Sequence, residues 1–360
     1  MPRPFLQAHS RLVAAGLMLS AVPSPAASRD GKNWRLDLHS STVVQALSAA
    51  AQEQRSLVTT YYQAEWRWQP LPWLGLQSEL EGGQVVGHNQ DENLGENLGS
   101  HWKLNEMQED PELFVPILYL AGEVPGSNLS WRLGKISPES CFDANRAARS
   151  KRTKFIAQPF FRNTAVAAAN KGLGGFVRWT ATSRAELALC ASDANARSTL
   201  SGLTTWRGEW FRSAELTLRP LAEPAQAAVR LVLWETERGG VEDGGWGISA
   251  DWEIAPTWVA FLRAGDGAER FARSRNLFAG GITWEAPFGR RQDFFGIGLA
   301  QADAVRGGRR TESMCEVVYR WQINPRIALS PHVQYIRHPA RSTVPDAWAF
   351  GLRFSIAVAK

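Results

Sequence analysis

The chain has 360 residues, of which 44% are hydrophobic, and its formal net charge at pH 7 is +5. This modest basic excess gives no reason to expect a nucleic-acid partner. The three cysteines, Cys141, Cys190 and Cys315, are an odd number at wide spacing, so they predict neither a disulfide framework nor a metal site, although one incidental disulfide stays open. The sequence suggests no cofactor.

The first 27 residues have the order of a secretory signal peptide. Arg3 and Arg11 precede an apolar segment at 12–22, and a proline- and alanine-rich segment follows at 23–28. We predict cleavage near residue 27, which leaves 28–360 as one domain of an exported protein. No later run of about eighteen apolar residues could form a membrane helix, so the mature chain could cross a membrane only as β-strands.

Seven short turn signals divide the rest of the chain into alternating apolar and polar runs. They lie at 69–72, 123–126, 181–184, 219–224, 255–257, 286–289 and 324–326. Seven turns join fourteen strands, and further strands at 34–42 and 347–358 bring the predicted number to sixteen. Between residues 41 and 55 the spacing of Val43, Val44, Leu47 and Ala51 is helical and predicts a short helix in the first loop.

The last run, 347–358, gives the clearest strand pattern. Its apolar face carries Trp348, Phe350, Leu352, Phe354, Ile356 and Val358, and the alternate positions are small or polar. Strands of soluble proteins are usually about five or six residues long, whereas about ten residues of tilted strand cross a bilayer. Pro331, inside the preceding strand, removes a ladder hydrogen bond and predicts a bulge or local break.

The connections at the other ends of the strands are longer. They lie at 82–111, 136–171, 192–208, 237–245, 265–276, 303–312 and 337–346. An even strand number with short periplasmic turns and long extracellular loops is typical of bacterial outer-membrane barrels. A barrel of about sixteen strands encloses a water-filled channel, so the polar faces must point inward and the apolar faces must meet lipid. The sequence therefore predicts an all-β transmembrane antiparallel barrel.

Tryptophan is abundant, with sixteen residues, many of them near the predicted strand ends. Rings at the headgroup level form the aromatic girdles of membrane barrels, although some of these residues could instead face the lumen. Trp234 tests the choice between a girdle position and a lumen position. If Val229, Leu231 and Leu233 face lipid, alternation makes Trp234 point into the pore.

Several stretches resemble the carbohydrate-selective porins of the OprB family. They are WRLGKISPESCFDANR (131–146), GLGGFVRW (172–179), ELALCASDAN (186–195), GEWFRSAELTLRP (208–220), GWGISADWEIAPTWVAFLRAG (245–265), CEVVYRWQINPRIALSPHVQYIRHP (315–339) and DAWAFGLRFSI (346–356). The resemblance implies a sixteen-stranded outer-membrane porin of a Gram-negative bacterium, through which sugars such as glucose diffuse into the periplasm. It also implies contact with outer-membrane lipid, lipopolysaccharide and the barrel-assembly machinery, and it leaves a homo-oligomer possible. One departure is the last residue, Lys360, where many outer-membrane barrels end in an aromatic residue.

A passive pore needs no catalytic group, because the diameter and lining of its constriction decide what passes. Alternation places both charge signs on the predicted inner face, where guanidinium and carboxylate groups can hydrogen-bond sugar hydroxyls and aromatic rings can stack on a sugar ring. These residues could equally line a wet wall and pair with one another. The pore-lining candidates are Arg132, Arg178, Glu215, Arg219, Arg230, Trp234, Asp251, Glu253, Arg263, Glu316, Arg320 and Arg353.

The loop at 136–171 is the best candidate to fold into the channel and narrow it. Its candidate residues are Asp143, Asn145, Arg146, Arg149, Lys151 and Arg152. Its basic residues would then favour anions or acidic sugars, which leaves an anion-preferring or general porin as an alternative. The same residues could instead meet lipopolysaccharide at the cell surface. The acidic loop that includes Glu96 and Glu106 matches no calcium-binding spacing and is predicted to be a solvated face.

A different class of function, a lipase or esterase built on an outer-membrane barrel, needs a serine beside a histidine. Ser330 and His332 lie two residues apart on one predicted face, but no hydrolase motif accompanies them. A structural or adhesive barrel without a ligand is a third possibility. The sequence favours the porin.

Overall fold

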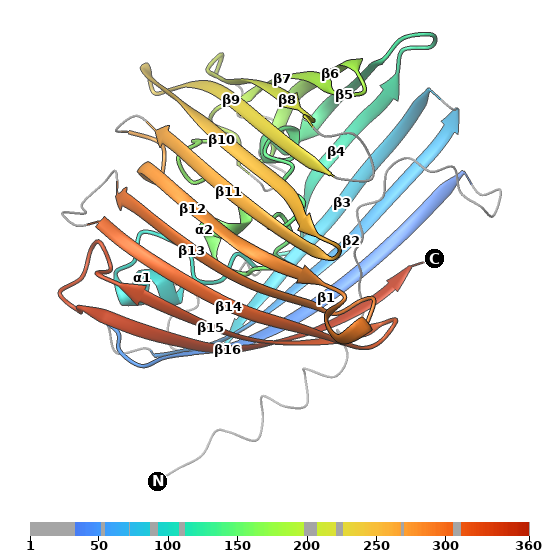
Figure 1. Cartoon of the computed structure of the whole chain (residues 1–360). Coiled ribbons are helices and arrows are strands. Elements are labelled where there is room, and N and C mark those ends of the chain that lie inside the picture. Colours follow the sequence, from blue (N-terminus) through green and yellow to red (C-terminus); the bar gives the residue numbers. More distant parts are fainter. Residues whose placement is uncertain are drawn as a thin grey trace.

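The computed structural model describes residues 33–51, 55–71, 73–86, 93–107, 112–197, 207–220, 226–267, 270–304 and 311–359. These residues form one closed antiparallel barrel of sixteen strands, in which each strand pairs with its neighbours in sequence (Figure 1). β1 and β16 close the barrel through pairs that run from Asp37 opposite Ala359 to Leu47 opposite Ala349. The predicted fold is therefore confirmed. The predicted signal peptide, residues 1–27, lies outside the described residues.

The strands range from 8 to 16 residues. Their bounds are β1 (Trp34–Leu47), β2 (Ser56–Leu71), β3 (Leu74–Val86), β4 (Phe114–Glu123), β5 (Leu129–Ile136), β6 (Gly172–Thr182), β7 (Ala185–Asp193), β8 (Trp210–Leu218), β9 (Ala227–Arg238), β10 (Val241–Ala255), β11 (Trp258–Gly267), β12 (Ser274–Glu285), β13 (Phe294–Ala304), β14 (Thr311–Asn324), β15 (Ile327–Arg337) and β16 (Asp346–Ala359).

Strand alternation separates an apolar outer face from a mixed inner face. In β9, Leu233 is 56% exposed, whereas the next residue, Trp234, is 4% exposed and faces the interior. Outward leucines, valines and phenylalanines recur in the same way on most other strands. Period-two side chains on a closed sheet produce this division, and a bilayer would cover the outer apolar surface.

The ends of three strands, β2, β11 and β12, carry aromatic residues on the outer face. Trp66 and Trp68 are exposed near the end of β2, and the rings of Trp258 and Trp284 stack with centroids 5.0 Å apart. These four residues lie at the end of the barrel that has the short turns. They fit an aromatic girdle at one membrane interface.

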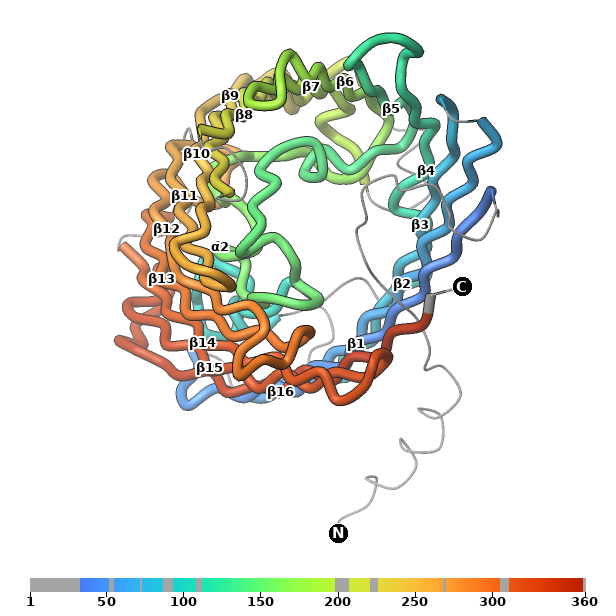
Figure 2. The backbone as a smooth tube through the Cα atoms, turned by 45° about the vertical axis from the view of Figure 1, so that its right-hand side comes forward, coloured from blue at the N-terminus to red at the C-terminus, as the bar shows by residue number. Residues whose placement is uncertain are grey.

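Two short helices belong to loops that lie inside the barrel, as Figure 2 shows: α1 (Leu94–Leu98) and α2 (Gln158–Phe161). The Asn93 side chain caps α1 by accepting a hydrogen bond from the Glu96 backbone N–H at 3.1 Å. Gly99 ends α1 with φ of 82°, a conformation that glycine adopts without strain. The described residues also contain two single 3₁₀ turns, η1 (Pro138–Cys141) and η3 (Pro287–Gly289). No helix in the described ranges has the length and apolar character required to cross a bilayer.

Two local predictions were wrong. The predicted helix at 41–55 is replaced by β1, which continues as a strand to Leu47, because pairing with β2 and β16 supplies its backbone hydrogen bonds. The predicted long loop at 237–245 is a two-residue turn, Gly239-Gly240, between β9 and β10. Both glycines have positive φ, as tight hairpin turns require, and they allow the strands to continue to Arg238 and from Val241.

The predicted local break at Pro331 is confirmed on one side of β15. Pairing of β14 with β15 runs to Val318 opposite His332 and resumes at Trp321 opposite Leu329, and Pro331 lies in the interval. On the other side, Pro331 pairs in register with Leu352 of β16. The missing proline N–H thus interrupts only one of the two ladders.

The barrel wall is uneven in height. Strands β4 to β8 have 8 to 11 residues each. Across the barrel, β1, β14 and β16 have 14 residues each and β2 has 16. The side formed by β4 to β8 is called the low wall below, and the side that includes β14, β16, β1 and β2 is called the high wall.

Candidate pore and its constriction loop

The connection between β5 and β6, residues 137–171, runs through the barrel interior (Figure 2) and is called the constriction loop below. Its aromatic side chains pack on the inner wall. Phe155 contacts Phe160 of the same loop and Phe261 and Phe294 of the wall, with ring centroids 5.2, 5.6 and 6.0 Å apart. Burial of four phenylalanines, each worth roughly 1.5–3 kcal/mol, holds the loop against β11 and β13.

A second segment, residues 93–107 between β3 and β4, supports the constriction loop from one side. Gln158 donates from its backbone N–H to Lys103 O at 3.0 Å, and Glu106 donates from its backbone N–H to Ile156 O at 2.9 Å. The segment also reaches the wall, where Gln334 Nε2 donates to Leu104 O at 2.9 Å. The two loops and the wall thus form one packed unit.

Glu106 belongs to this packed unit, which corrects the prediction that the acidic loop is a solvated face. Its side chain is 4% exposed and pairs with Arg162 of the constriction loop, with Oε1 and Nη2 2.7 Å apart. Burial alone would raise the pKa of Glu106, but the positive charges of Arg162, Lys103 and Lys151 outweigh burial and hold it at about 2. Of the other acidic residues there, Glu96 is exposed, and Asp91, Glu92, Glu109 and Asp110 lie outside the described residues.

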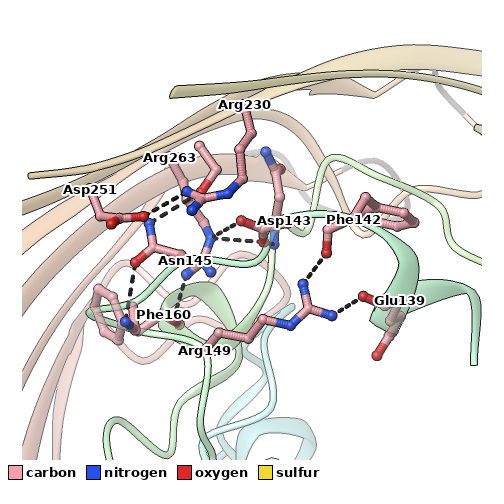
Figure 3. Close-up of polar contacts among 12 residues, drawn as sticks. Glu139, Phe142, Asp143, Asn145, Arg149, Phe160, Arg230, Asp251 and Arg263 are labelled. Atoms are coloured by element: carbon pink, nitrogen blue, oxygen red, sulfur yellow. Dashed lines mark hydrogen bonds and ion pairs between the residues drawn. The ribbon is translucent and has the colours of Figure 1, made fainter. Parts of the chain in front are cut away.

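The centre of the constriction loop is fixed by a buried ion pair. Arg263 on β11 donates from Nε to both carboxylate oxygens of Asp143, at 3.0 and 2.9 Å, and from Nη1 to Phe160 O at 2.5 Å (Figure 3). Arg263 is 0% exposed and Asp143 2%. An arginine so deeply buried requires a carboxylate partner, and this one joins two turns of the loop to the wall.

Asp143 and Asn145 extend this attachment to β8 and β10. The Asp143 backbone N–H donates to Glu215 Oε2 at 2.6 Å, and Asp143 Oδ2 accepts from the Asn163 N–H at 3.1 Å. Asn145 Nδ2 donates to Ala250 O at 3.0 Å, while its Oδ1 accepts from the Ala147 backbone N–H at 3.0 Å. Both side chains therefore fold the loop and bind it to the wall at once.

Charges of β9 and β10 hold the next part of the loop. Arg230 Nη1 lies 2.6 Å from Asp251 Oδ2, and the same oxygen accepts from the Arg146 backbone N–H at 3.3 Å. The Arg146 guanidinium lies 3.4 Å from Glu253 Oε2 and donates to Gln226 Oε1 at 2.5 Å. These predicted residues thus lie together in one cluster.

The far end of the loop is held by β14 and β16. The two carboxylate oxygens of Glu316 accept from the backbone N–H groups of Ile156 and Ala157, both at 2.9 Å. Arg353 donates from Nη1 to Lys151 O at 2.6 Å and from Nη2 to Lys154 O at 3.0 Å. Wall charges here satisfy loop backbone groups that would otherwise be buried without partners.

Two basic residues of the loop donate to carbonyl groups of the loop itself. Arg149 donates to the carbonyl oxygens of Phe142 and Glu139 (Figure 3), and Lys154 donates to Arg146 O and pairs with Glu285 at 3.1 Å. Burial lowers the pKa of Arg149 and of Lys154 from their ordinary values. Neither side chain therefore presents its charge freely to solutes.

The low wall carries a more open set of predicted residues. Arg132 on β5 lies over the rings of Phe176 and Tyr119, at 5.0 and 5.6 Å from their centroids. Glu186 Oε1 forms an ion pair with Arg178 Nε at 3.0 Å, and Glu186 Oε2 accepts a hydrogen bond from Arg219 Nη2 at 3.3 Å. This wall therefore combines guanidinium groups with aromatic faces. Trp234 lies on the inner face of β9, and its indole N–H has no hydrogen-bond partner within the described residues.

The remaining predicted basic residues lie at the tip of the loop and on β14. Lys151 Nζ is 4.8 Å from the ring centroid of Tyr61 on β2. Arg152 and Arg320 line a small cavity between the loop tip and the wall. These three residues are therefore separate from the ion pairs around Asp143.

The sequence analysis missed a second ion-pair cluster that joins the loop to β2 and β3. Tyr61 OH donates to Glu81 Oε1 at 2.6 Å, and Lys171, at the end of the constriction loop, pairs with Glu81. Arg162 pairs with Glu139 and Glu106 and was also missed. Strict alternation along β2 and β3 would have placed Tyr61 and Glu81 on the inner face, but not their loop partners.

Ser330 and His332 do not form a nucleophile and base. Both are buried, but within the described residues Ser330 Oγ has no hydrogen-bond partner. His332 Nε2 lies 3.3 Å from Gln45 Nε2. A serine hydrolase requires the serine hydroxyl to contact the imidazole, so this pair supplies no catalytic geometry.

Comparison with known proteins supports the same class. The model of the family described as "Carbohydrate-selective porin, OprB family" matches residues 234–357. A search of curated proteins gave no match. Among solved structures, the high-pH structure of Pseudomonas putida OprB is similar with a TM-score of 0.74 and 13% identity, over 90% of this chain and 94% of that one.

Two further structures share the fold. The low-pH structure of Pseudomonas putida OprB has a TM-score of 0.56 and 12% identity, over 90% of this chain and 92% of that one. A mutant of the Rh. blastica porin has a TM-score of 0.57 and 10% identity, over 90% of this chain and all of that one. The barrel is thus of the porin type, a fold that implies an outer membrane, and the predicted resemblance to the carbohydrate-selective porins of the OprB family is confirmed by the match over residues 234–357.

Proposed function

We propose that the protein is an outer-membrane porin through which sugars of the glucose type diffuse passively into the periplasm. The observation that carries this proposal is the constriction loop, which lies inside a sixteen-stranded barrel and is fastened to its inner wall by buried ion pairs. A loop held in this way narrows a wide barrel to a fixed opening, and a fixed opening selects solutes by size and lining.

The low wall offers the chemistry that a sugar needs. Arg132 and Arg178 present donors beside the Phe176 ring, at 5.0 and 5.1 Å from its centroid, and Tyr119 OH donates to Gln77 Oε1 at 2.7 Å. Guanidinium groups donate to several hydroxyls of a sugar, and an aromatic face takes its apolar C–H surface. Neutral hydroxyl-rich solutes can therefore exchange water for protein contacts along this wall.

In this proposal the chain is exported by its first 27 residues, lies in lipid with lipopolysaccharide on its outer side, and has no catalytic role. The same basic residues permit a weaker preference for anions. The pore could also assemble as a homo-oligomer without any change in the path of the solute.

The test is swelling of liposomes that contain the refolded protein, in iso-osmotic glucose, a disaccharide, an amino acid and a sugar acid. Faster entry of glucose than of the amino acid supports the proposal, and equal rates for all small solutes would reduce the protein to a general porin. Arg132→Ala should lower the ratio of glucose entry to amino-acid entry. The matched control is Leu133→Ala on the outer face of the same strand, where Leu133 is 60% exposed, and it should leave that ratio unchanged.

A further inference from the structure

A small basic cavity lies between the tip of the constriction loop and the high wall, in the half of the barrel nearest the short turns. Its volume is about 40 Å³. The polar residues that line it include Arg152 and Thr153 from the loop, Arg320 from β14, Arg326 from the β14–β15 turn, His39 from β1 and Ser355 from β16. A cavity of this size takes a few water molecules or a single small polar group.

The charge of this cavity is positive. Three guanidinium groups from three separate segments line it, and all nine lining residues, which belong to the described part of the chain, are non-acidic. The charges of Arg152, Arg320, Arg353 and Lys151 all act on His39 through space. Like charges gathered in a partly enclosed space repel one another, so an anion would be stabilised there.

The carboxylate of Asp293, which directly precedes β13, is held by other residues. Asp293 accepts from Arg290 Nε at 2.6 Å, from Tyr319 OH at 2.7 Å and from the Gln322 backbone N–H at 2.8 Å. Arg320 instead donates from Nη1 to Gln292 O at 2.8 Å, and its Nε is buried with no hydrogen-bond partner within the described residues. The hydrogen-bond partner of Arg320 is thus a carbonyl oxygen and not a carboxylate, and its Nε is an unpaired donor among the described residues.

We propose that this cavity is a binding site for the oxyanion group, carboxylate or phosphate, of a small anionic solute. Guanidinium groups match such groups because their fork of N–H donors fits two oxygens of one anion. The cavity holds the charged group, and the rest of the solute extends into the channel. The inference rests on the proposed function only for the orientation of the barrel in the outer membrane. With the short turns in the periplasm, the site lies on the periplasmic side of the constriction.

The experiment measures single-channel current in planar bilayers while inorganic phosphate or gluconate is added, with glucose as the uncharged comparison. A bound anion should reduce the chloride current with a saturable dependence on concentration. Arg326→Gln and Arg320→Gln should each raise the half-blocking concentration about tenfold, the effect of losing one charge-assisted contact. Block by phosphate alone assigns the site to tetrahedral anions, and block by gluconate as well extends it to sugar acids.

The matched control is Arg184→Gln. Arg184 is exposed in the β6–β7 turn at the same end of the barrel, as Arg326 is in the β14–β15 turn, so both variants remove one positive charge from that mouth. A tenfold change in the Arg326 variant with no change in the Arg184 variant supports a local site. Equal changes of the half-blocking concentration in both variants would refute the local site and indicate a general electrostatic field at that mouth. Unchanged current at all phosphate concentrations would also refute the site.

Failure of this site and failure of the sugar pore are distinguishable. Glucose entry into liposomes reports the pore alone, so rapid glucose entry without phosphate block removes only the anion site. If the channel does not conduct, calorimetric titration of the detergent-solubilised protein with phosphate decides the question. Saturable heat that is lost in the Arg152→Gln and Arg320→Gln double variant supports the site, and absence of heat in the unchanged protein refutes it.

Discussion

Arginine serves opposite purposes in two regions of the lumen. Around Asp143, the wall arginines Arg230 and Arg263 are buried and paired with Asp251 and Asp143, so these ion pairs fasten the constriction loop. Beside His39, Arg152 and Arg320 line a small, partly enclosed cavity with no acidic lining residue among those described. The first region should therefore govern stability and opening size, and the second should govern which ions pass.

Residue type alone therefore does not decide whether a charge in the lumen controls ion selectivity. Removal of one member of a buried ion pair leaves the other uncompensated, which costs far more than loss of a half-exposed charge. The following variants separate the two regions by the size of their effect on stability.

The largest effect is expected for Arg263→Ala. It leaves Asp143 buried without its ion-pair partner, which should lower the free energy of unfolding by about 3–5 kcal/mol, while the sixteen-strand barrel still forms. Urea unfolding of the refolded barrel measures the loss, and single-channel conductance should rise because the loop is released. Arg212→Ala is the control: Arg212 pairs with Glu235 at 2.7 Å on the outer face, where both side chains are about 60% exposed, and it should change stability by about 0.5 kcal/mol or less.

A smaller effect with a defined pH dependence is expected for Glu106→Gln. Because the folded-state pKa of Glu106, about 2, lies below its ordinary value of 4.5, the ionised carboxylate stabilises the folded state above pH 4.5. That contribution, about 2–3 kcal/mol, should disappear as the pH falls from 4.5 through 2. Unfolding curves of the two proteins between pH 7 and pH 2 should therefore converge on the acid side. A difference that stays constant over this range would contradict the ion pair with Arg162.

The smallest effect on stability is expected for Arg320→Gln. Among the described residues, the Arg320 side chain has one hydrogen bond, to Gln292 O, so its loss should cost about 1 kcal/mol or less. The same change should shift the reversal potential in a salt gradient toward cations, because one positive charge leaves the channel lining. A large loss of stability without a shift in reversal potential would place Arg320 with the anchoring residues instead.

The sequence could predict the barrel because its signals are local and repeated. Turn residues and period-two alternation act within about ten residues. Together they predict sixteen strands and an inward-facing Trp234 side chain. The exception is the segment at 41–55, which was predicted to be a helix and whose first part is the end of β1. Val43 and Val44 are adjacent apolar residues, so alternation is lost there, yet Val43 is 1% exposed and Val44 50% exposed on opposite faces of β1.

The attachment of the constriction loop could not be predicted in the same way. Asp143 and Arg263 are 120 residues apart, and Ile156 and Glu316 are 160 apart. Their meeting depends on strand register and on the course of the loop across the lumen, which no local pattern encodes. Glu106 illustrates the same limit, since an acidic loop residue reads as solvated unless the partner arginine is known.

The low wall from β4 to β8 has a consequence for the lipid around the barrel. A strand of eight residues, such as β5, reaches only about 20 Å across a bilayer when it tilts by about 40°, whereas a strand of fourteen residues reaches about 35 Å. The apolar band of an outer-membrane barrel is about 25 Å tall, which exceeds the shorter of these heights. The bilayer beside β5 must become thinner or the barrel must tilt. The protein therefore has a hydrophobic mismatch with the bilayer along one side.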